Sequence, residues 1–123
     1  DAFFYIFSNE PKWVKKWVDD LIESQITEDM DREDIRNLEH RFVLVEANSE
    51  HTGYLDLFLM SRCKHNIISN SSFSWWASWL NDNPDRLVVA PDKWMNDKDS
   101  TDVYTKGMIL VNAKGRVNRT VKE

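Results

Sequence analysis

Short apolar runs alternate with longer amphipathic segments along most of the chain. Four of these runs have the length and composition of strands. They are residues 3–8, 42–45, 66–69 and 87–90, the last of them ended by Pro91. The first run is apolar throughout, which is typical of a strand buried on both faces of a parallel sheet.

A helix is expected directly after the first strand. Ser8-Asn9-Glu10-Pro11 is a helix-start sequence, with capping residues, an early acid and an early proline. The apolar stripe of this helix consists of Trp13, Val14, Trp17, Val18, Leu21 and Ile22. Residues 23–40 are acidic and polar, and we expect a long loop there with one weak helical turn. Its acids are interpreted as a solvated loop and not as a metal cage: Asp29, Asp31, Glu33 and Asp34.

Two more helices are expected between the later strands. Residues 52–63 predict a helix that turns three apolar side chains inward, namely Leu55, Leu59 and Met60. Residues 73–80 predict a helix capped by Ser72 or Ser74. It is apolar on almost every side, so we expect it to be deeply buried. Its tryptophans are more typical of a core than of a sugar-stacking surface: Trp75, Trp76 and Trp79.

The order of these elements predicts the fold class. Strands alternating with helices are typical of an α/β protein, in which crossover helices connect the strands of a parallel sheet. Ligands bind at the carboxyl ends of the strands in such sheets, which selects residues 8–10, 69–74 and 90–91. After Trp94 the chain becomes hydrophilic, and residues 108–111 are expected to form a strand, a helix or a docked tail.

Composition narrows the classes of partner. The 123 residues are 41% hydrophobic and 30% charged, as in one ordinary globular domain. A net charge of −5 without a basic block disfavours nucleic acid as a partner. No apolar run is long enough to span a membrane, and a single cysteine, Cys63, allows no internal disulfide. Because Asp1 leads directly into a core strand, we expect the chain to be a piece of a longer protein.

Residues 64–76 are the most informative stretch for chemistry. There a short strand delivers an asparagine and several serines onto the start of a helix. Unpaired backbone N–H groups and the positive end of the helix dipole favour an anion at such a place, and small hydroxyl side chains permit close approach of a phosphate. The stretch has neither the glycines nor the lysine of a P-loop. Plain helix capping by Ser71 and Ser72 is the alternative interpretation.

Asp56 interrupts a very apolar helical segment, where a carboxylate is costly unless it is paired or used. Its two oxygens could bind the two neighbouring donors of a guanine base. Equally, an acid in a first helical turn is favourable to the helix dipole, so both interpretations stay open. Cys63 and His65 lie close together, but one cysteine and one histidine do not make a metal site.

Three segments resemble successive motifs of the alpha-1,2-fucosyltransferases of glycosyltransferase family 11. They read YIFS at residues 5–8, DLFLMSRCKHNIISNSSFSWW at 56–76 and VAPDKW at 89–94. The resemblance covers residues 3–96 and implies a Rossmann-like domain, the C-terminal half of a two-Rossmann-domain glycosyltransferase. Such an enzyme transfers fucose from GDP-fucose to a glycan acceptor with inversion and without a metal or other cofactor. We therefore expect a GDP-sugar-binding domain over residues 1–96 and a polar C-terminal extension over 97–123.

The resemblance also implies roles for single residues. Asp56 would bind the guanine, and the loop at the diphosphate would contain Asn70, Ser71, Ser72 and Phe73. His65 and Asn66 would position that loop. Ser8 begins a turn that usually reads Ser-Asp-Asp in the family, so Asn9 and Glu10 depart from the pattern and put its polar contacts in doubt.

One family motif, His-x-Arg-Arg-x-Asp, has no counterpart here, and His40-Arg41-Phe42 does not match it. Its arginine supports the diphosphate of the leaving GDP and precedes the YIFS segment in the family. The chain is therefore expected to begin after that motif, to be inactive alone and to meet its acceptor through a missing half. Two alternatives stay open: a non-catalytic Rossmann-like structural or interaction module, and transfer of another sugar from a guanine nucleotide. We expect a cytoplasmic protein, or a Golgi protein if the parent is of the animal type.

Overall fold

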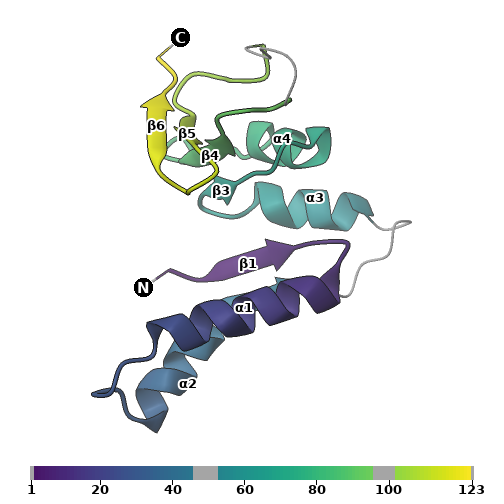
Figure 1. Ribbon diagram of the computed structural model, residues 1–123. Coiled ribbons are helices and arrows are strands. Elements are labelled where there is room, and N and C mark those ends of the chain that lie inside the picture. Colours follow the sequence, from purple (N-terminus) through teal and green to yellow (C-terminus); the bar gives the residue numbers. More distant parts are fainter. Residues whose placement is uncertain (1, 46–52, 96–101, 123) are drawn as a thin grey trace. The chain divides into compact units, whose positions relative to one another are not determined.

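The computed structural model describes residues 2–45, 53–95 and 102–122, and its elements are shown in Figure 1. The chain divides into two compact units, residues 1–51 and 52–123. The described residues form four helices and six strands, and both sheets contain parallel pairs. The predicted α/β class is therefore confirmed.

The first unit is a strand, two helices and a strand. Strand β1 (Phe4–Phe7) pairs in parallel with β2 (Phe42–Val45), in a register that places Phe4 opposite Phe42. Helices α1 (Pro11–Gln25) and α2 (Arg32–His40) connect the two strands. The core of the unit consists of Val14, Val18 and Ile22 from α1 and Leu38 from α2. Both strands predicted for this part of the sequence are thus confirmed.

Three expectations for this unit were wrong. β1 is not buried on both faces, since Phe4 and Tyr5 are 42% and 54% exposed. Trp13 and Trp17 belonged to the predicted apolar stripe, yet both are exposed, so the buried stripe of α1 is narrower. The expected loop over residues 23–40 contains α2, a regular helix of nine residues.

The acids of the expected loop explain why α2 forms. The Asp31 side chain accepts the backbone N–H of Asp34 at 2.8 Å, and the Asp34 side chain accepts the backbone N–H of Asp31 at 3.1 Å. This reciprocal capping box satisfies two backbone donors at the helix start. Ile35 and Leu38 then turn toward the interior, one helical turn apart. These acids therefore begin a helix instead of lying in a loop.

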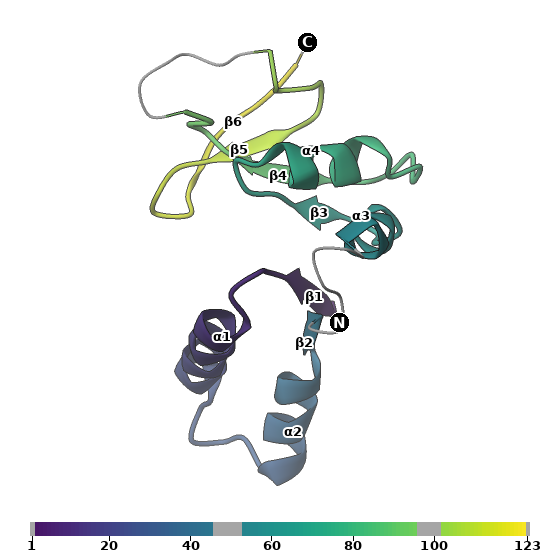
Figure 2. The ribbon, with the colours of Figure 1, turned by 90° about the vertical axis from the view of Figure 1, so that its right-hand side faces the viewer.

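The second unit is built on a four-stranded sheet in the order β3-β4-β5-β6. Its elements are α3 (Gly53–Ser61), β3 (Asn66–Ile67), α4 (Ser72–Trp79), β4 (Val88–Pro91), β5 (Ile109–Val111) and β6 (Val117–Thr120). The first three strands are parallel and β6 is antiparallel to β5. Helices α3 and α4 pack against each other (Figure 2). The core consists of Ile68, Val88, Ala90, Met108, Leu110 and Val121.

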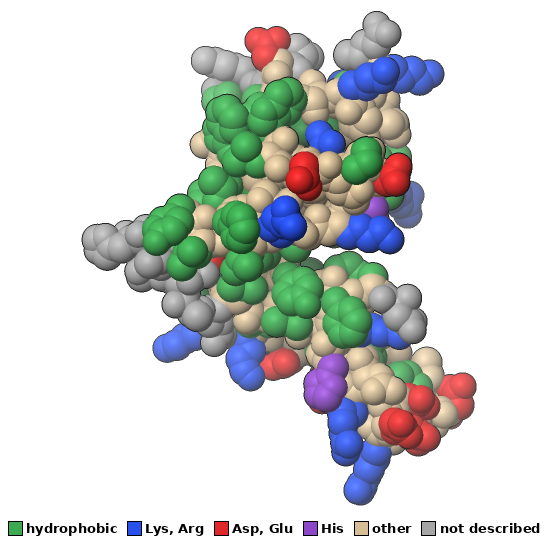
Figure 3. All heavy atoms as spheres, turned by 180° about the vertical axis from the view of Figure 1, so that it is seen from behind, with side chains coloured by type: hydrophobic (Ala, Val, Ile, Leu, Met, Phe, Trp, Pro, Cys, Tyr) green, Lys and Arg blue, Asp and Glu red, His purple; other side chains and the backbone are tan. Residues whose placement is uncertain are grey.

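Helix α4 lies where it was predicted, but it is not deeply buried. Its buried side chains are small, namely Ser74, Ala77 and Ser78. Trp76 and Trp79 are about half exposed, so the expectation that they belong to a core was wrong. Leu55 and Leu59 of α3 are also exposed, and of the three residues expected to point inward only Met60 is buried. Apolar side chains accordingly appear on the surface of both units in Figure 3.

The C-terminal part of the chain completes this sheet. Residues 109–111 form β5, and a turn with Gly115 at φ +77° leads into β6, a strand that the sequence pattern did not indicate. Met108, Leu110 and Val121 supply half of the core residues of the unit. The functional boundary expected at residue 96 stays a prediction.

Candidate functional site at the start of helix α4

Ser71 is the N-cap of α4. Its side-chain oxygen accepts the backbone N–H of Ser74 at 3.2 Å, and its carbonyl accepts the N–H of Trp75 at 3.1 Å. The cap had been predicted at Ser72 or Ser74, one or three residues too late. Its place follows from the backbone, since Ser71 has the extended φ and ψ of an N-cap.

Three serine hydroxyls stabilise this turn from within. The Ser71 and Ser74 oxygens are 2.9 Å apart, and the Ser69 oxygen lies 3.3 Å from that of Ser74. Ser74 is buried, and its hydroxyl lies 3.1 Å from the carbonyl oxygens of both Ser69 and Ser71, which share its single hydrogen as acceptors. Because Ser74 and Ser71 are engaged with each other, they shape the loop, and other groups are left to contact a ligand.

Those other groups are the first two N–H groups of the helix. The backbone N–H groups of Ser72 and Phe73 precede the first intrahelical hydrogen bond, and neither has a protein acceptor within the described ranges. Both residues are exposed. Two open N–H groups at the positive end of a helix, beside the Ser72 hydroxyl, form a place where an anion is stabilised.

Asn70 ties this loop to the end of the neighbouring strand. Its side-chain N–H group donates to the carbonyl of Trp94 at 3.2 Å. Trp94 follows β4, and its ring meets Tyr104 edge to face with centroids 6.4 Å apart. The Tyr104 hydroxyl donates to the Pro91 carbonyl at 2.7 Å, and burial, followed by the nearby Asp92, raises the pKa of Tyr104. The carboxyl ends of β3 and β4 are thus joined by a direct hydrogen bond between the segments that follow them.

Asp56 lies in the first turn of α3 and is partly buried. The carboxyl-terminal ends of α3 and α4 both reach the beginning of β3, where Asn66 bonds to the Met60 carbonyl and to Asn81. The starts of the two helices therefore lie toward the other end of β3 (Figure 1). The first turn of α3, which contains Asp56, and the start of α4 at Ser71 therefore lie at the same end of this pair of packed helices.

His65 and Asn66 lie at the opposite end of this pair of helices. The Leu87 N–H donates to His65 Nδ1 at 2.9 Å, and the Asn66 side chain donates to the Met60 carbonyl at 2.7 Å. Within the described residues neither side chain bonds to the serine turn. Any influence of theirs on that turn is therefore exerted through β3 and the helices, not by contact.

Ser8 belongs to the first unit. It follows β1, and its side-chain oxygen accepts the N–H of Glu10 at 3.0 Å, directly before Pro11 begins α1. Glu10 is the N-cap of α1 but makes no side-chain capping bond. The predicted contact of Ser8 with a ligand stays a prediction.

Two further properties concern cofactors and membranes. Within the described part of the chain, no three His, Cys, Asp or Glu side chains are grouped so that they could hold a metal ion. Independence from a metal stays a prediction. In the same residues, no helix is long and apolar enough to cross a lipid bilayer.

An α/β unit with an open helix start at the carboxyl edge of its sheet is the general design of a nucleotide- or phosphate-binding domain. Comparison with known proteins gives the family. The chain belongs to glycosyl transferase family 11, whose model matches residues 1–112. This confirms the resemblance found in the three sequence motifs.

Two curated relatives come from Escherichia coli. The O-antigen biosynthesis glycosyltransferase WbnK is 47% identical over 58 residues, which are 47% of this chain and 19% of that protein. An alpha-1,2-colitosyltransferase is 29% identical over 96 residues, 78% of this chain and 27% of that protein. The chain thus matches only about a fifth to a quarter of the length of these relatives. No solved structure matches the chain.

Proposed function

We propose that this chain binds the nucleotide of a GDP-activated sugar, as the C-terminal Rossmann-like part of an inverting fucosyltransferase that acts on a glycan acceptor. The observation that carries the proposal is the open start of α4. The exposed residues Ser72 and Phe73 provide two backbone N–H groups without a protein acceptor within the described residues, and Ser72 adds a hydroxyl. They lie at the sheet edge where α/β proteins bind ligands. Membership of family 11 supports the class of reaction.

The diphosphate is assigned to the turn at Ser71, Ser72 and Phe73. A phosphate oxygen there would accept the N–H groups of Ser72 and Phe73 and the Ser72 hydroxyl, while the helix dipole adds a favourable field. Each hydrogen bond to a charged group contributes about 1.5–3 kcal/mol. Asn70 would keep the turn close to the end of β4 through its bond to Trp94.

The guanine is assigned to Asp56. The N1–H and the amino group of guanine form a pair of donors that one carboxylate can accept in a bidentate manner. Adenine and uracil present no such pair of donors, so this contact would provide the selectivity for the base. Asp56 and the serine turn, at the same end of this pair of helices, would then hold the two ends of GDP.

The departing diphosphate must also be stabilised during transfer, because negative charge develops on it. Two N–H groups supply only part of that stabilisation. Fixed cations from elsewhere in a longer parent enzyme would supply the rest, and the acceptor would bind there as well. We therefore expect nucleotide binding by this chain without transfer activity.

The transferred sugar has a second candidate. One relative is named an alpha-1,2-colitosyltransferase, so a sugar other than fucose fits the same family. Both candidates share the nucleotide assignment, since the base and the diphosphate are bound apart from the sugar. Titration with GDP-fucose and with GDP-colitose would separate them, because the sugar nucleotide that is the true donor should bind more tightly than the other.

A non-catalytic module is the alternative from another class. The departure of Asn9 and Glu10 from the family pattern favours it. It predicts no selective binding of any nucleotide, whereas the donor-binding proposal predicts a preference for GDP.

The test is calorimetric titration of the chain with GDP, GMP, ADP and UDP. We expect GDP to bind most tightly, with GMP weakened by the loss of one phosphate and ADP and UDP by the wrong base. Asp56→Asn should abolish the preference for GDP over ADP. Asp20→Asn is the matched control, because Asp20 is an exposed helical aspartate of the first unit. Equal affinity for all four nucleotides, or none at millimolar concentration, would overturn the proposal.

A further inference from the structure

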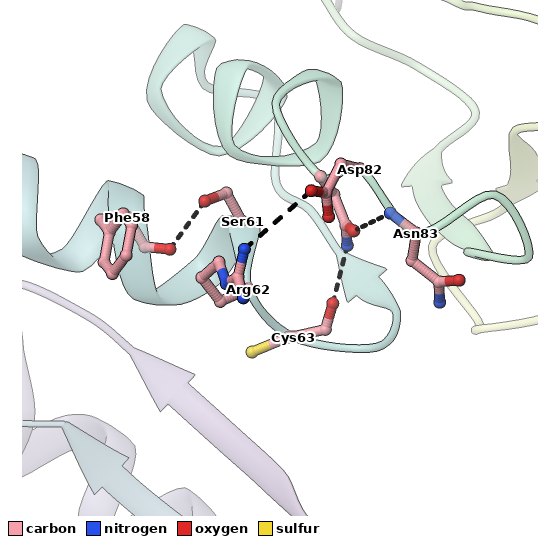
Figure 4. Close-up of polar contacts among 7 residues, drawn as sticks. Phe58, Ser61, Arg62, Cys63, Asp82 and Asn83 are labelled. Carbon is pink, nitrogen blue, oxygen red and sulfur yellow. Dashed lines mark hydrogen bonds and ion pairs between the residues drawn. The ribbon is translucent and has the colours of Figure 1, made fainter.

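A pair of buried asparagines joins the ends of α3 and α4. Asn66 and Asn81 are 6% and 3% exposed, and the Asn81 side-chain N–H group donates to Asn66 Oδ1 at 2.8 Å. Asn66 Nδ2 donates to the carbonyl of Met60 in α3 at 2.7 Å, and Asn81 Nδ2 also donates to the Cys63 carbonyl at 2.8 Å. The Asn83 N–H donates to Asn81 Oδ1 at 3.0 Å. Figure 4 shows the ends of this network at Cys63 and Asn83.

Both amide groups are held in one orientation. The Met60 carbonyl can only accept, which fixes the N–H side of Asn66. The Asn83 N–H can only donate, which fixes the oxygen side of Asn81. Turning either amide over would place two acceptors or two donors together. The pair therefore has one satisfied arrangement, which sets a definite spacing between the two helix ends and the start of β3.

Stability alone does not require such a pair. Apolar side chains of similar volume would avoid the cost of burying two amides, which is offset here only because all their groups are bonded. The outer contacts are weaker, since Arg62 and Asp82 approach only to 4.0 Å and are largely exposed. Unlike apolar side chains in the same place, the two amides fix the relative positions of the two helix ends.

The positions of the two helix ends also affect the positions of the first turns of the same helices. Asp56 precedes Met60 by four residues, one helical turn or about 6 Å along the axis. Asn81 follows α4 directly after its C-cap Leu80, and α4 is a rigid rod of eight residues that begins next to Ser71. An amide pair that holds the last turns of α3 and α4 therefore determines how far apart Asp56 and the Ser71-Ser72 turn lie.

We infer that Asn81, with Asn66, is a positioning residue that sets the distance between the base-binding and the phosphate-binding ends of the nucleotide site. The inference rests on the proposed function, because it assigns the two ends of GDP to α3 and α4. It predicts different effects on two kinds of ligand, whereas a simple loss of stability predicts the same effect on both. A ligand that bridges both helices senses their spacing, whereas a ligand that touches only α4 does not.

The experiment compares GDP with pyrophosphate on the chain and on Asn81→Ala, at a temperature where circular dichroism shows both to be folded. We expect the Kd for GDP to rise about tenfold, as when a buried hydrogen-bond partner is removed. The Kd for pyrophosphate should change by less than about twofold. Asn81→Ser, which keeps a small donor, is the milder variant to use if Asn81→Ala does not fold.

The matched control is Asn112→Ala. Its side-chain oxygen accepts the N–H groups of Lys114 and Arg116 in the turn between β5 and β6, so the same amide is removed away from both helices. The control should leave both Kd values unchanged. A parallel rise in the GDP and pyrophosphate constants of the Asn81 variants, or no rise in either, would overturn the positioning role. Failure of the unchanged chain to bind GDP would instead overturn the proposed function.

Discussion

Two helices of this chain begin with caps of different charge. Helix α2 starts with a capping box in which Asp31 and Asp34 each accept the other's backbone N–H. Helix α4 starts with the single neutral hydroxyl cap of Ser71. At both helices the two N–H groups after the cap have no acceptor within the described ranges, so the starts differ in the charge around these groups. Both helices carry the same positive dipole end, so the chemistry of the cap makes the difference.

The difference shows how one backbone feature can serve stability or binding. At α2, fixed carboxylates already neutralise the helix start, and Glu33 adds a further negative charge in the first turn. An anionic ligand would be repelled there. At α4 the cap is neutral and small, so the field of the helix remains available for a phosphate. A negatively charged start stabilises the helix, whereas a neutral one is suited to an anionic ligand.

Converting the α4 start into the α2 type should have the largest effect. Asp is among the best N-cap residues, so Ser71→Asp should keep or raise the free energy of unfolding. Its charge would lie close to the diphosphate and cost about 2 kcal/mol of binding, or roughly thirtyfold in the Kd for GDP. Calorimetry and urea unfolding measure the two quantities. Unchanged GDP affinity would mean that Ser71 is only a helix cap.

Removing the Ser72 hydroxyl should weaken GDP binding moderately and leave the stability of the fold almost unchanged. Ser72 is exposed and makes no side-chain hydrogen bond in the described part of the chain. Ser72→Ala should therefore change the free energy of unfolding by less than about 0.5 kcal/mol. It should weaken GDP by about 1.5 kcal/mol, since a hydrogen bond to a charged group is lost. A stability loss with unchanged binding would reverse the assignment.

Opening the α2 start should affect stability alone. Asp31→Ala removes the acceptor for the Asp34 N–H, which should lower the free energy of unfolding by about 1 kcal/mol. Asp31→Ser retains an acceptor and should lower it less. Urea unfolding followed by circular dichroism measures both variants, and their GDP affinity should equal that of the unchanged chain. Weaker GDP binding in Asp31→Ala would show that the two helix starts do not act independently.

The contrast between the two starts also shows what the sequence could reveal. That a serine caps α4 was readable, because a run of serines precedes an apolar helix, but the cap was predicted at Ser72 or Ser74 and lies at Ser71. Helix α2 was missed, since only Ile35 and Leu38 mark its inner face among acids that resemble a loop. The spacing of Asp31 and Asp34 was the available signal, because an acid can replace the usual residues of a capping box.

Burial was harder to predict than the elements themselves. The apolar composition of α4 indicated a core helix, but which of its faces is covered depends on the elements packed against it, and Trp76 and Trp79 remain half exposed. The polar strand β6 was missed because its pairing with β5 follows from the turn at Gly115, not from periodicity. The Asn66–Asn81 pair joins residues fifteen positions apart, and no local pattern indicates such a contact.

The smallest expected effect is on the pH dependence of unfolding, which should differ between the two helix starts. Asp29 lies just before α2, and the Thr27 hydroxyl, which donates to it at 2.6 Å, lowers the pKa of that carboxyl below its ordinary value of 3.8. Because the folded pKa is the lower one, this stabilisation is fully present above the unfolded pKa and is lost as the pH falls through the folded pKa. Thr27→Val removes the donor, so unfolding measured between pH 5 and about pH 2 should show a weaker acid dependence in the variant. The hydroxyl cap of α4 does not titrate in this range, and Ser71→Ala should leave the shape of the pH profile unchanged. An equal change of profile in both variants would show that carboxylates near α2 are not what distinguishes the two helix starts in acid.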